Sequence, residues 1–240
     1  MNIKLEIEYD GTNYAGWQYQ PNKITIQGEI EKALAQLLQK KLRITGASRT
    51  DAGVSALGQV ANFEVTPLKG LSLAKLQCGL NSILPKDIWI RKISKAADEF
   101  NSRRYSKSKI YRYRIIANPS PIRQKFAWFV RYELDINKMR RAVKLFIRHN
   151  DFSLFCAAKD KNGEVDIESI IISQKRDQID ITIKANRFLY KMVRRIVGAL
   201  VEIGRGHRSL DDIKKALAGE KHRSLICAPA HGLILKKVKY

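Results

Sequence analysis

The sequence has few cysteines, and none of them forms a recognisable pair. Its 240 residues include Cys78, Cys156 and Cys227, with no C-x-x-C spacing among them. An odd number of cysteines without such spacing argues against a disulfide framework and indicates a reducing compartment. The chain also lacks an apolar run of about 18 residues, the length of a membrane-spanning helix, and the apolar block of a signal peptide. We therefore expect a cytoplasmic protein that contacts no membrane.

Patterns typical of metal and nucleotide sites are missing as well. The four histidines, His149, His207, His222 and His231, are scattered, without an H-E-x-x-H motif or a Cys/His pair of zinc spacing. The G-x-x-x-x-G-K-[ST] phosphate loop, the strand-linked G-x-G-x-x-G motif and the G-x-S-x-G elbow are also absent. These absences argue against a metal site and against a dinucleotide or nucleoside triphosphate site.

Acidic residues are outnumbered, which leaves a large positive charge. The chain has 45 Lys and Arg against 23 Asp and Glu, a formal net charge of +22. A folded protein with this imbalance repels itself unless a polyanion is its usual neighbour. The basic residues are spread along the chain and alternate with Tyr105, Tyr111 and Tyr113, which can stack on bases. We expect a nucleic-acid partner, the alternative being a basic surface without a ligand.

Hydrophobic periodicity predicts an α+β fold. Expected strands cover residues 3–9, 41–46, 57–65, 87–94, 103–114, 170–173, 179–183 and 233–238; expected helices cover 25–38, 72–81, 136–147, 189–203 and 210–217. The similar order in both halves favours two related α+β halves, 1–104 and 105–240. We expect them to share a mixed, mainly antiparallel sheet, with helices on its outer face and a basic cleft.

The most informative segment is Ser48-Arg49-Thr50-Asp51-Ala52-Gly53-Val54-Ser55-Ala56. Apolar patterning resumes on both sides, so Asp51 is expected on a loop between two strands, a common position for a catalytic group. Gly53 permits backbone conformations closed to other residues. Arg49 is near enough in sequence to favour the ionised form of the carboxylate. The simpler alternative is that Asp51 only closes a turn.

Two further residues stand out in the second half. Tyr111 lies on a predicted strand whose other face is basic, and Arg194 lies at the edge of the apolar stripe of the predicted helix 189–203. A group at such an edge can reach a cleft while its stem packs. Taken alone, each side chain also fits a structural role, Tyr111 as a packing aromatic and Arg194 as a cation that extends from the core edge into water.

Several separated motifs, in order, resemble the tRNA pseudouridine synthase A family, whose usual signature is G-R-T-D-A-G-V-H-A. The resemblance extends over nearly the whole chain. Its motifs are Tyr9-Asp10-Gly11 with Tyr14, Gly16-Trp17-Gln18, Arg49 to Val54, Phe100 to Arg103, Tyr111-Arg112-Tyr113, Asp151 to Phe155, Asn186 to Tyr190, Met192-Val193-Arg194, Ile196-Val197-Gly198 and Ala228 to Leu233. Ser48 and Ser55 stand where the family usually has Gly and His.

The resemblance implies a role for each candidate residue. Asp51 matches the catalytic aspartate, Tyr111 the tyrosine that stacks on the target base, and Arg194 the basic partner of the aspartate. Arg49 matches the loop arginine that helps displace the target nucleotide, and Arg103 a basic position of the middle motif. Asp51 acts either as a nucleophile at C1′ or as a base at C2′. The acceptor of the C5 proton is either Tyr111 or a water.

The family isomerises uridines 38 to 40 in the anticodon stem-loop of tRNA, without a cofactor and as a homodimer. The resemblance therefore predicts a cytoplasmic tRNA pseudouridine synthase that has two α+β halves per protomer. The departures at Ser48 and Ser55 motivate one alternative, a basic RNA-binding or RNA-folding protein that keeps the fold without the activity.

Overall fold

In the computed structural model the chain divides into two compact units. The structure describes residues 1–66, 70–147, 150–157, 163–220 and 224–240, so His149 and His222 lie outside the described residues. The first unit comprises Met1–Lys107 with Ile234–Tyr240, and the second comprises Ser108–Leu233. The final strand therefore groups with the first unit. The two halves expected from the sequence, 1–104 and 105–240, assign this strand to the C-terminal half instead. Each unit combines helices with strands, which confirms the α+β class.

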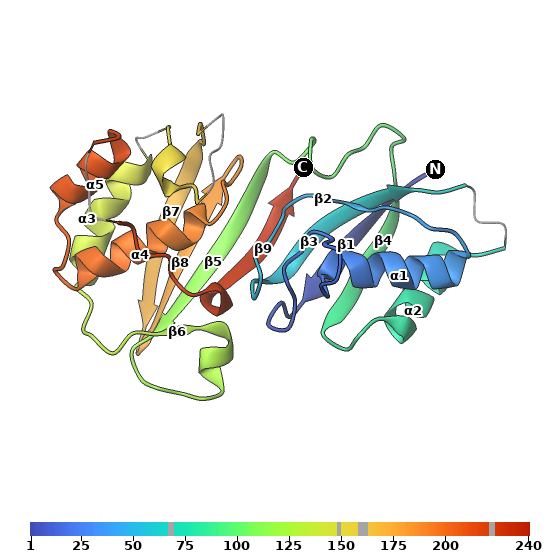
Figure 1. The fold of residues 1–240 in the computed structure, drawn as a ribbon, viewed down its shortest axis with the longest axis horizontal. Coiled ribbons are helices and arrows are strands. Elements are labelled where there is room, and N and C mark those ends of the chain that lie inside the picture. Colours follow the sequence, from blue (N-terminus) through green and yellow to red (C-terminus); the bar gives the residue numbers. More distant parts are fainter. Residues whose placement is uncertain (67–69, 148–149, 158–162, 221–223) are drawn as a thin grey trace. The chain divides into compact units, whose positions relative to one another are not determined.

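The first unit is a sheet in the order β4-β1-β3-β9, with β2 beside β3. Its elements are β1 (Asn2–Tyr9), α1 (Ile26–Leu38), β2 (Thr45–Gly46), β3 (Ser55–Glu64), α2 (Leu73–Ile83), β4 (Ile88–Ala96) and β9 (Leu233–Lys239). The β1/β3, β1/β4 and β2/β3 pairs are antiparallel, while β3 and β9 are parallel. Figure 1 shows α1 and α2 on one face of these strands.

The alternation of β1 sets the core of this unit. Ile3, Leu5 and Ile7 are fully buried and Tyr9 is nearly so, as expected for one face of a half-buried strand. The helix α1 begins where the sequence indicates, because the Thr25 side chain accepts a hydrogen bond from the Gly28 amide at 3.2 Å. The apolar face of α1 places Ile26, Ile30 and Leu34 in the same core.

The second unit has the strand order β5-β8-β7, with β6 beside β5. Its strands are β5 (Ser108–Ile116), β6 (Trp128–Phe129), β7 (Ile167–Lys175) and β8 (Gln178–Ala185), and its α-helices are α3 (Ile136–Ile147), α4 (Met192–Gly204) and α5 (Leu210–Leu217). Short 3-10 turns cover Arg123–Phe126, Ser153–Phe155 and Ala230–Gly232 (η3). The β5/β8 and β7/β8 pairs are antiparallel and β5/β6 is parallel. The mixed, mainly antiparallel character is thus present in both units.

The expected strand at 41–46 is wrong except at its end, where Thr45 and Gly46 pair with β3. The reason is that side chains of α1 occupy the backbone groups of Ile44. Its amide donates to Glu31 Oε1 at 3.0 Å, and its carbonyl accepts from Gln27 Nε2 at 3.2 Å. A residue whose amide and carbonyl are both bound in this way does not need a strand partner.

Two elements begin several residues later than the sequence predicts. The strand expected from residue 103 begins at Ser108, because the Asn101 side chain accepts the amides of Arg103 and Arg104, both at 3.1 Å, and forms a turn. The helix expected from residue 189 begins at Met192, preceded by Lys191 with a φ of +59°. Within the described residues, no helix is both long and apolar enough to cross a membrane.

Candidate active site

Asp51 lies on a loop between β2 and β3, as the sequence predicts. The loop turns directly after the acid, since the Val54 amide donates to the Asp51 carbonyl at 3.1 Å. Gly53 has a φ of +77°, the left-handed conformation that favours glycine, so the turn needs this residue. Asp51 is neither fully buried nor fully exposed. The carboxylate therefore belongs to a defined turn of the first unit.

The segment that follows β1 holds this loop from one side. The Thr50 carbonyl accepts from the Trp17 amide at 3.0 Å, and the Tyr14 carbonyl accepts from the Gly53 amide at 3.3 Å. The hydroxyls of Tyr9 and Thr50 share a buried hydrogen bond of 2.7 Å. The backbone on both sides of Asp51 is thus bound to a separate segment, so the loop has a restricted geometry.

Two glycines allow the close approach of that segment. A Cβ at Gly11 would lie 2.1 Å from the Val54 carbonyl oxygen, and a Cβ at Gly16 would lie 2.8 Å from the Thr50 carbonyl oxygen. Gly16 also has a φ of +98°. A side chain at either position would displace the loop backbone, which explains the glycines of two motifs near the start of the chain.

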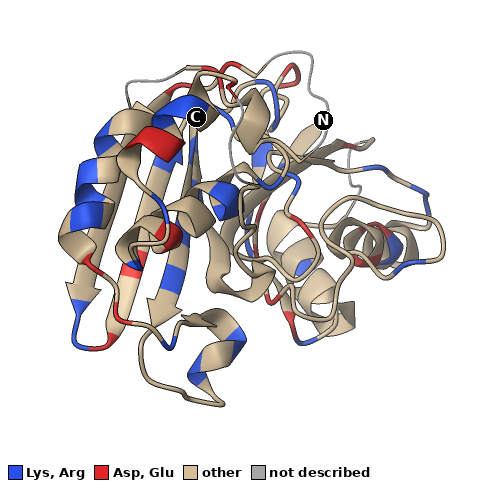
Figure 2. Cartoon of the chain, turned by 60° about the vertical axis from the view of Figure 1, so that its left-hand side comes forward, with Lys and Arg blue, Asp and Glu red and all other residues tan. Residues whose placement is uncertain are grey.

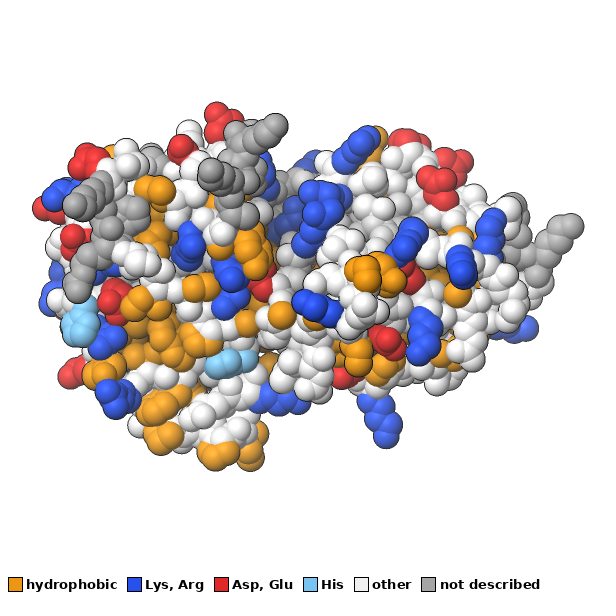
Figure 3. Space-filling view, in the orientation of Figure 1, with side chains coloured by type: hydrophobic (Ala, Val, Ile, Leu, Met, Phe, Trp, Pro, Cys, Tyr) orange, Lys and Arg blue, Asp and Glu red, His pale blue; other side chains and the backbone are white. Residues whose placement is uncertain are grey.

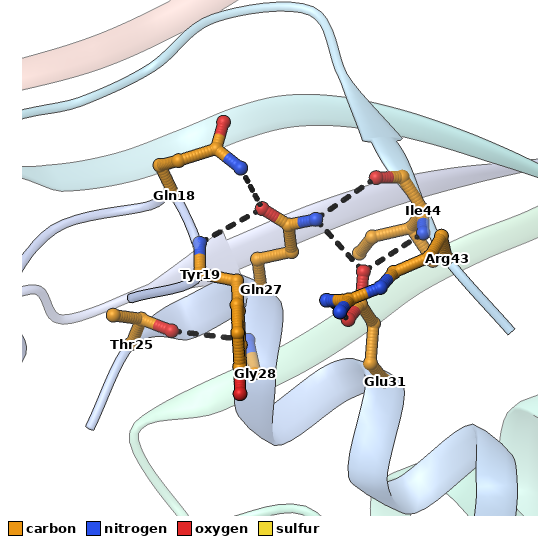
Figure 4. A network of polar contacts seen from close by, with 8 residues as sticks. All are labelled: Gln18, Tyr19, Thr25, Gln27, Gly28, Glu31, Arg43 and Ile44. Atoms are coloured by element: carbon orange, nitrogen blue, oxygen red, sulfur yellow. Dashed lines mark hydrogen bonds and ion pairs between the residues drawn. The ribbon is translucent and has the colours of Figure 1, made fainter. Parts of the chain in front are cut away.

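A polar network fixes the start of α1 and the chain that leads into β2 (Figure 4). Gln27 accepts from Gln18 Nε2 and from the Tyr19 amide, each at 2.9 Å, and donates to Glu31 at 2.7 Å. Glu31 in turn binds the Ile44 amide and pairs with Arg43 at 2.9 Å. Gln27 and Glu31 are almost fully buried. Because such buried groups are costly to leave unpaired, this network fixes the approach to the Asp51 loop.

The other two candidate residues of the first unit are cations close enough to influence each other. Arg49 and Arg103 are both exposed residues. Burial lowers the pKa of the Arg49 guanidinium, and the positive charge of Arg103 lowers it further. Two like charges held near one another favour the binding of an anion, which relieves their repulsion. The structure therefore brings Arg49, Asp51 and Arg103 into the same unit.

Tyr111 lies on β5 of the second unit, on the face that also carries Tyr113 and Ile115. These three side chains are buried, in agreement with the predicted alternation, and Tyr111 is 5% exposed. Its ring contacts Phe188 edge to face, with centroids 4.9 Å apart and planes at 83°. Phe188 belongs to the Asn186 to Tyr190 motif. The packing orients the Tyr111 ring.

Arg194 lies in the first turn of α4, also in the second unit, and is half-buried. Its Nε donates to the Ala228 carbonyl at 2.7 Å, and its own carbonyl accepts from the Ala228 amide at 3.1 Å. Arg194 is therefore bound at both its backbone and its guanidinium, which an arginine extending into water would not be. The sequence predicts Arg194 at the edge of the apolar stripe of this helix, and the half-buried side chain beside the buried residues of α4 agrees with that prediction.

Sequence reasoning missed the residues that hold Arg194. Ala228 acts through its backbone, so its side chain carries no chemical signal. Gly198 on α4 allows the approach, because a Cβ there would lie 2.0 Å from the Ile226 carbonyl oxygen. The signals in the sequence were the motifs Ile196-Val197-Gly198 and Ala228 to Leu233, whose residues carry no predicted role.

The charges agree with a polyanionic partner. Figure 2 shows Lys and Arg on helices, strands and loops, and Figure 3 shows them spread over the face that it draws. One exposed set lies on α3 and consists of Lys138, Arg140, Arg141 and Lys144. In the part of the chain that the structure describes, no group of three or more His, Cys, Asp and Glu residues could hold a metal ion.

Comparisons with known proteins match this chain nearly end to end. The family model described as tRNA pseudouridine synthase matches residues 6–106 and 142–240. The tRNA pseudouridine synthase A of Halalkalibacterium halodurans is 39% identical over 97% of this chain and 90% of its own. The corresponding proteins of Geotalea uraniireducens and Aquifex aeolicus are 42% and 39% identical, over 99% of this chain and 99% and 98% of theirs. This chain therefore belongs to the tRNA pseudouridine synthase family.

Proposed function

We propose that this protein isomerises uridine to pseudouridine in the anticodon stem-loop of tRNA, at positions 38 to 40. The observation that carries the proposal is the Asp51 turn between β2 and β3, in a chain that matches the family model along most of its length. An acid on a loop held by a rigid sheet is suited to catalysis, since the scaffold fixes its direction.

The reaction is an internal rearrangement of the nucleotide. The bond from ribose C1′ to N1 breaks, the base turns, and a bond from C1′ to C5 forms. The proton on C5 leaves and N1 gains a proton, so nothing is oxidised or reduced and no cofactor is required. Asp51 acts on the ribose, either as a nucleophile at C1′ or as a base at C2′. Both routes use the ionised carboxylate.

The remaining candidate residues serve binding and positioning. Tyr111 stacks on the target base, and stacking on an aromatic ring contributes roughly 1–3 kcal/mol per base. This offsets part of the few kcal/mol that removing a base from its stack costs. Arg194 pairs with Asp51, Arg49 helps displace the target nucleotide, and Arg103 binds its phosphate backbone. Tyr111 or a water accepts the C5 proton.

The net charge of +22 supports a tRNA substrate, because binding a polyanion relieves the self-repulsion and releases counterions. We propose a basic cleft for the RNA, a homodimer as the active form, and the cytoplasm as its location. The catalytic role of Asp51 and the homodimer are independent proposals, because the first concerns the turn between β2 and β3 and the second concerns the oligomeric state.

Release of tritium from tRNA labelled at uridine C5 tests the activity. The parent protein should release tritium, and Asp51→Asn should bind tRNA with similar affinity and release none. Asp98→Asn, which removes an exposed acid of the same unit, is the matched control and should behave like the parent. Tight, salt-sensitive tRNA binding by the parent without tritium release would instead identify a non-catalytic RNA-binding protein.

A further inference from the structure

Tyr113 forms a contact that the proposed reaction does not itself require. It lies two residues after Tyr111 on β5 and is fully buried. Its hydroxyl donates to the Pro229 carbonyl at 2.8 Å. Burial raises the pKa of this phenol, against the opposing effect of the nearby Arg194 charge. The hydroxyl therefore remains a donor at neutral pH.

Ala228, the residue before Pro229, binds Arg194 through its backbone. The Ala228 carbonyl accepts from Arg194 Nε at 2.7 Å, and the Ala228 amide donates to the Arg194 carbonyl at 3.1 Å. Consecutive carbonyls of one short segment are thus bound by Tyr113 and by Arg194. The two carbonyls are joined through φ and ψ of Pro229, and the proline ring fixes φ, here −53°. Binding the Pro229 carbonyl therefore restricts the direction of the Ala228 carbonyl next to it.

The segment has almost no room to shift. A Cβ at Gly232 would lie 2.6 Å from Cζ of Tyr113, so the chain passes directly against that ring. A Cβ at Gly198 would lie 2.0 Å from the Ile226 carbonyl oxygen, so the same segment lies equally close to α4. Contacts this close leave few alternative positions for residues 226 to 232.

The Nε bond matters because of the shape of the arginine side chain. A guanidinium is planar and carries its five N–H donors in a fixed fork. When Nε is bound to a fixed carbonyl, the plane of the fork and the direction of its two Nη groups are set as well. A preorganised donor of this kind loses less free energy when it meets an anion than one that must first be ordered.

We propose that Tyr113 is a positioning residue, which orients the Arg194 guanidinium through the carbonyls of Pro229 and Ala228. The inference rests on the proposed function, in which Arg194 pairs with Asp51. Tyr113 is separate from substrate recognition in this scheme, because its hydroxyl is occupied by the backbone. It should therefore affect the rate of the chemical step and leave the affinity for tRNA unchanged.

Tyr113→Phe removes only the hydroxyl and keeps the ring against Gly232. We expect the single-turnover rate of pseudouridine formation to fall by about tenfold, the scale of one lost orienting hydrogen bond. The dissociation constant for tRNA should stay within about twofold of the parent's. Gln77→Ala is the matched control, since it removes donors to the Ile90 and Arg91 carbonyls, at 3.1 and 3.0 Å, on elements that carry no candidate residue.

A double-mutant cycle separates positioning from general support of the fold. Arg194→Lys keeps the charge but removes the Nε donor, so in that background Tyr113→Phe should change the rate by less than about twofold. Should Tyr113→Phe fail to fold, Gly232→Ala replaces it, and we expect the same loss of rate at constant affinity.

The inference is overturned if Tyr113→Phe turns over at the parent's rate, if it weakens tRNA binding instead, or if its effect persists in full beside Arg194→Lys. A parent protein that forms no pseudouridine would refute the proposed function itself, which is a different outcome.

Discussion

The Ser55 hydroxyl accepts a hydrogen bond from the Gly11 amide at 3.0 Å, across 44 residues of sequence. Ser55 is the first residue of β3 and Gly11 follows β1, so the bond joins the end of the Asp51 loop to the segment that supports it. Both partners are buried. Ser55 stands where the family usually has His, and in this protein the serine has a structural role of its own.

Ser55→Ala should therefore destabilise the protein. The Gly11 amide would remain buried without its acceptor, which costs about 1–3 kcal/mol. The midpoint of urea denaturation should fall accordingly. Ser82→Ala, which removes an exposed hydroxyl bound to the Gly79 carbonyl at 2.8 Å, should leave the midpoint almost unchanged. Equal midpoints for the two variants would contradict this role of Ser55.

Gly16→Ala should reduce turnover through the geometry of the Asp51 loop. It introduces both an unfavourable φ of +98° and a Cβ that would lie 2.8 Å from the Thr50 carbonyl oxygen. Gly206→Ala provides the comparison, because Gly206 has a φ of +74° but no atom within 4 Å of the added Cβ. Strain alone costs about 1–2 kcal/mol.

We expect both glycine variants to lose stability and only Gly16→Ala to lose tritium release by tenfold or more, roughly the effect of a displaced catalytic group. Equal tritium release by the two variants would show that the close approach of Gly16 to the Thr50 carbonyl is unimportant for catalysis.

Gly198→Ala reverses the usual effect of alanine in a helix. Alanine stabilises a helix interior by about 1 kcal/mol relative to glycine, but here the Cβ would lie 2.0 Å from the Ile226 carbonyl oxygen. We expect a lower melting temperature and a slower reaction, since the Ala228 contact with Arg194 would be displaced.

Gly204→Ala on the same helix is the control. The atoms nearest to its Cβ belong to side chains, with Met139 Sδ at 3.0 Å and Leu134 Cδ2 at 3.3 Å, and the unbranched Met139 side chain can adjust without moving the backbone. Its activity should match the parent's. A stabilised and fully active Gly198→Ala protein would exclude the close packing of α4 on Ile226.

Arg49→Gln and Arg103→Gln should each lower the affinity for tRNA. Each should also make that affinity less sensitive to salt concentration. Removing one cation that binds a phosphate should reduce the slope of the logarithm of the binding constant against the logarithm of salt concentration by about 0.7–0.9. Binding isotherms from 50 to 200 mM salt, roughly the range in which such effects are large, measure the slope.

Arg91→Gln is the matched control for these two variants, because Arg91 is already paired with Glu8 on the strands β4 and β1. Its slope should equal the parent's. Unchanged slopes for Arg49→Gln and Arg103→Gln would remove both residues from the RNA-binding surface.

Much of the fold follows from local pattern. The alternation of Ile3, Leu5 and Ile7 predicted a strand with one buried face. The helical spacing of Met139, Val143 and Phe146 predicted α3 with its observed ends. The strands around the turn at Asp177 were also predicted, although both are longer than expected. These features depend on neighbours within one element, so short-range periodicity is enough to identify them.

The errors have a common cause in hydrogen bonds between side chains and the backbone. Ile44 has a strand-like sequence, but Gln27 and Glu31 of a preceding helix take its backbone groups. Ser108 rather than Arg103 begins β5 because of the Asn101 side chain. Propensity cannot anticipate the Ile44 bonds, since they depend on which side chain the tertiary fold brings to the backbone. The Asn101 turn is local, and its signal was masked by the strand-like pattern that follows it.

The sequence by itself determined the acid, its turn and the family: Asp51, Gly53 and the ordered motifs are properties of residue type and spacing. Only the tertiary structure decided how that turn is supported and how Arg194 is oriented. Those functions belong to backbone groups, such as the Thr50 and Ala228 carbonyls and the Gly11 amide. Every residue except proline carries the same backbone amide and carbonyl, so their partners become visible only when the chain is folded.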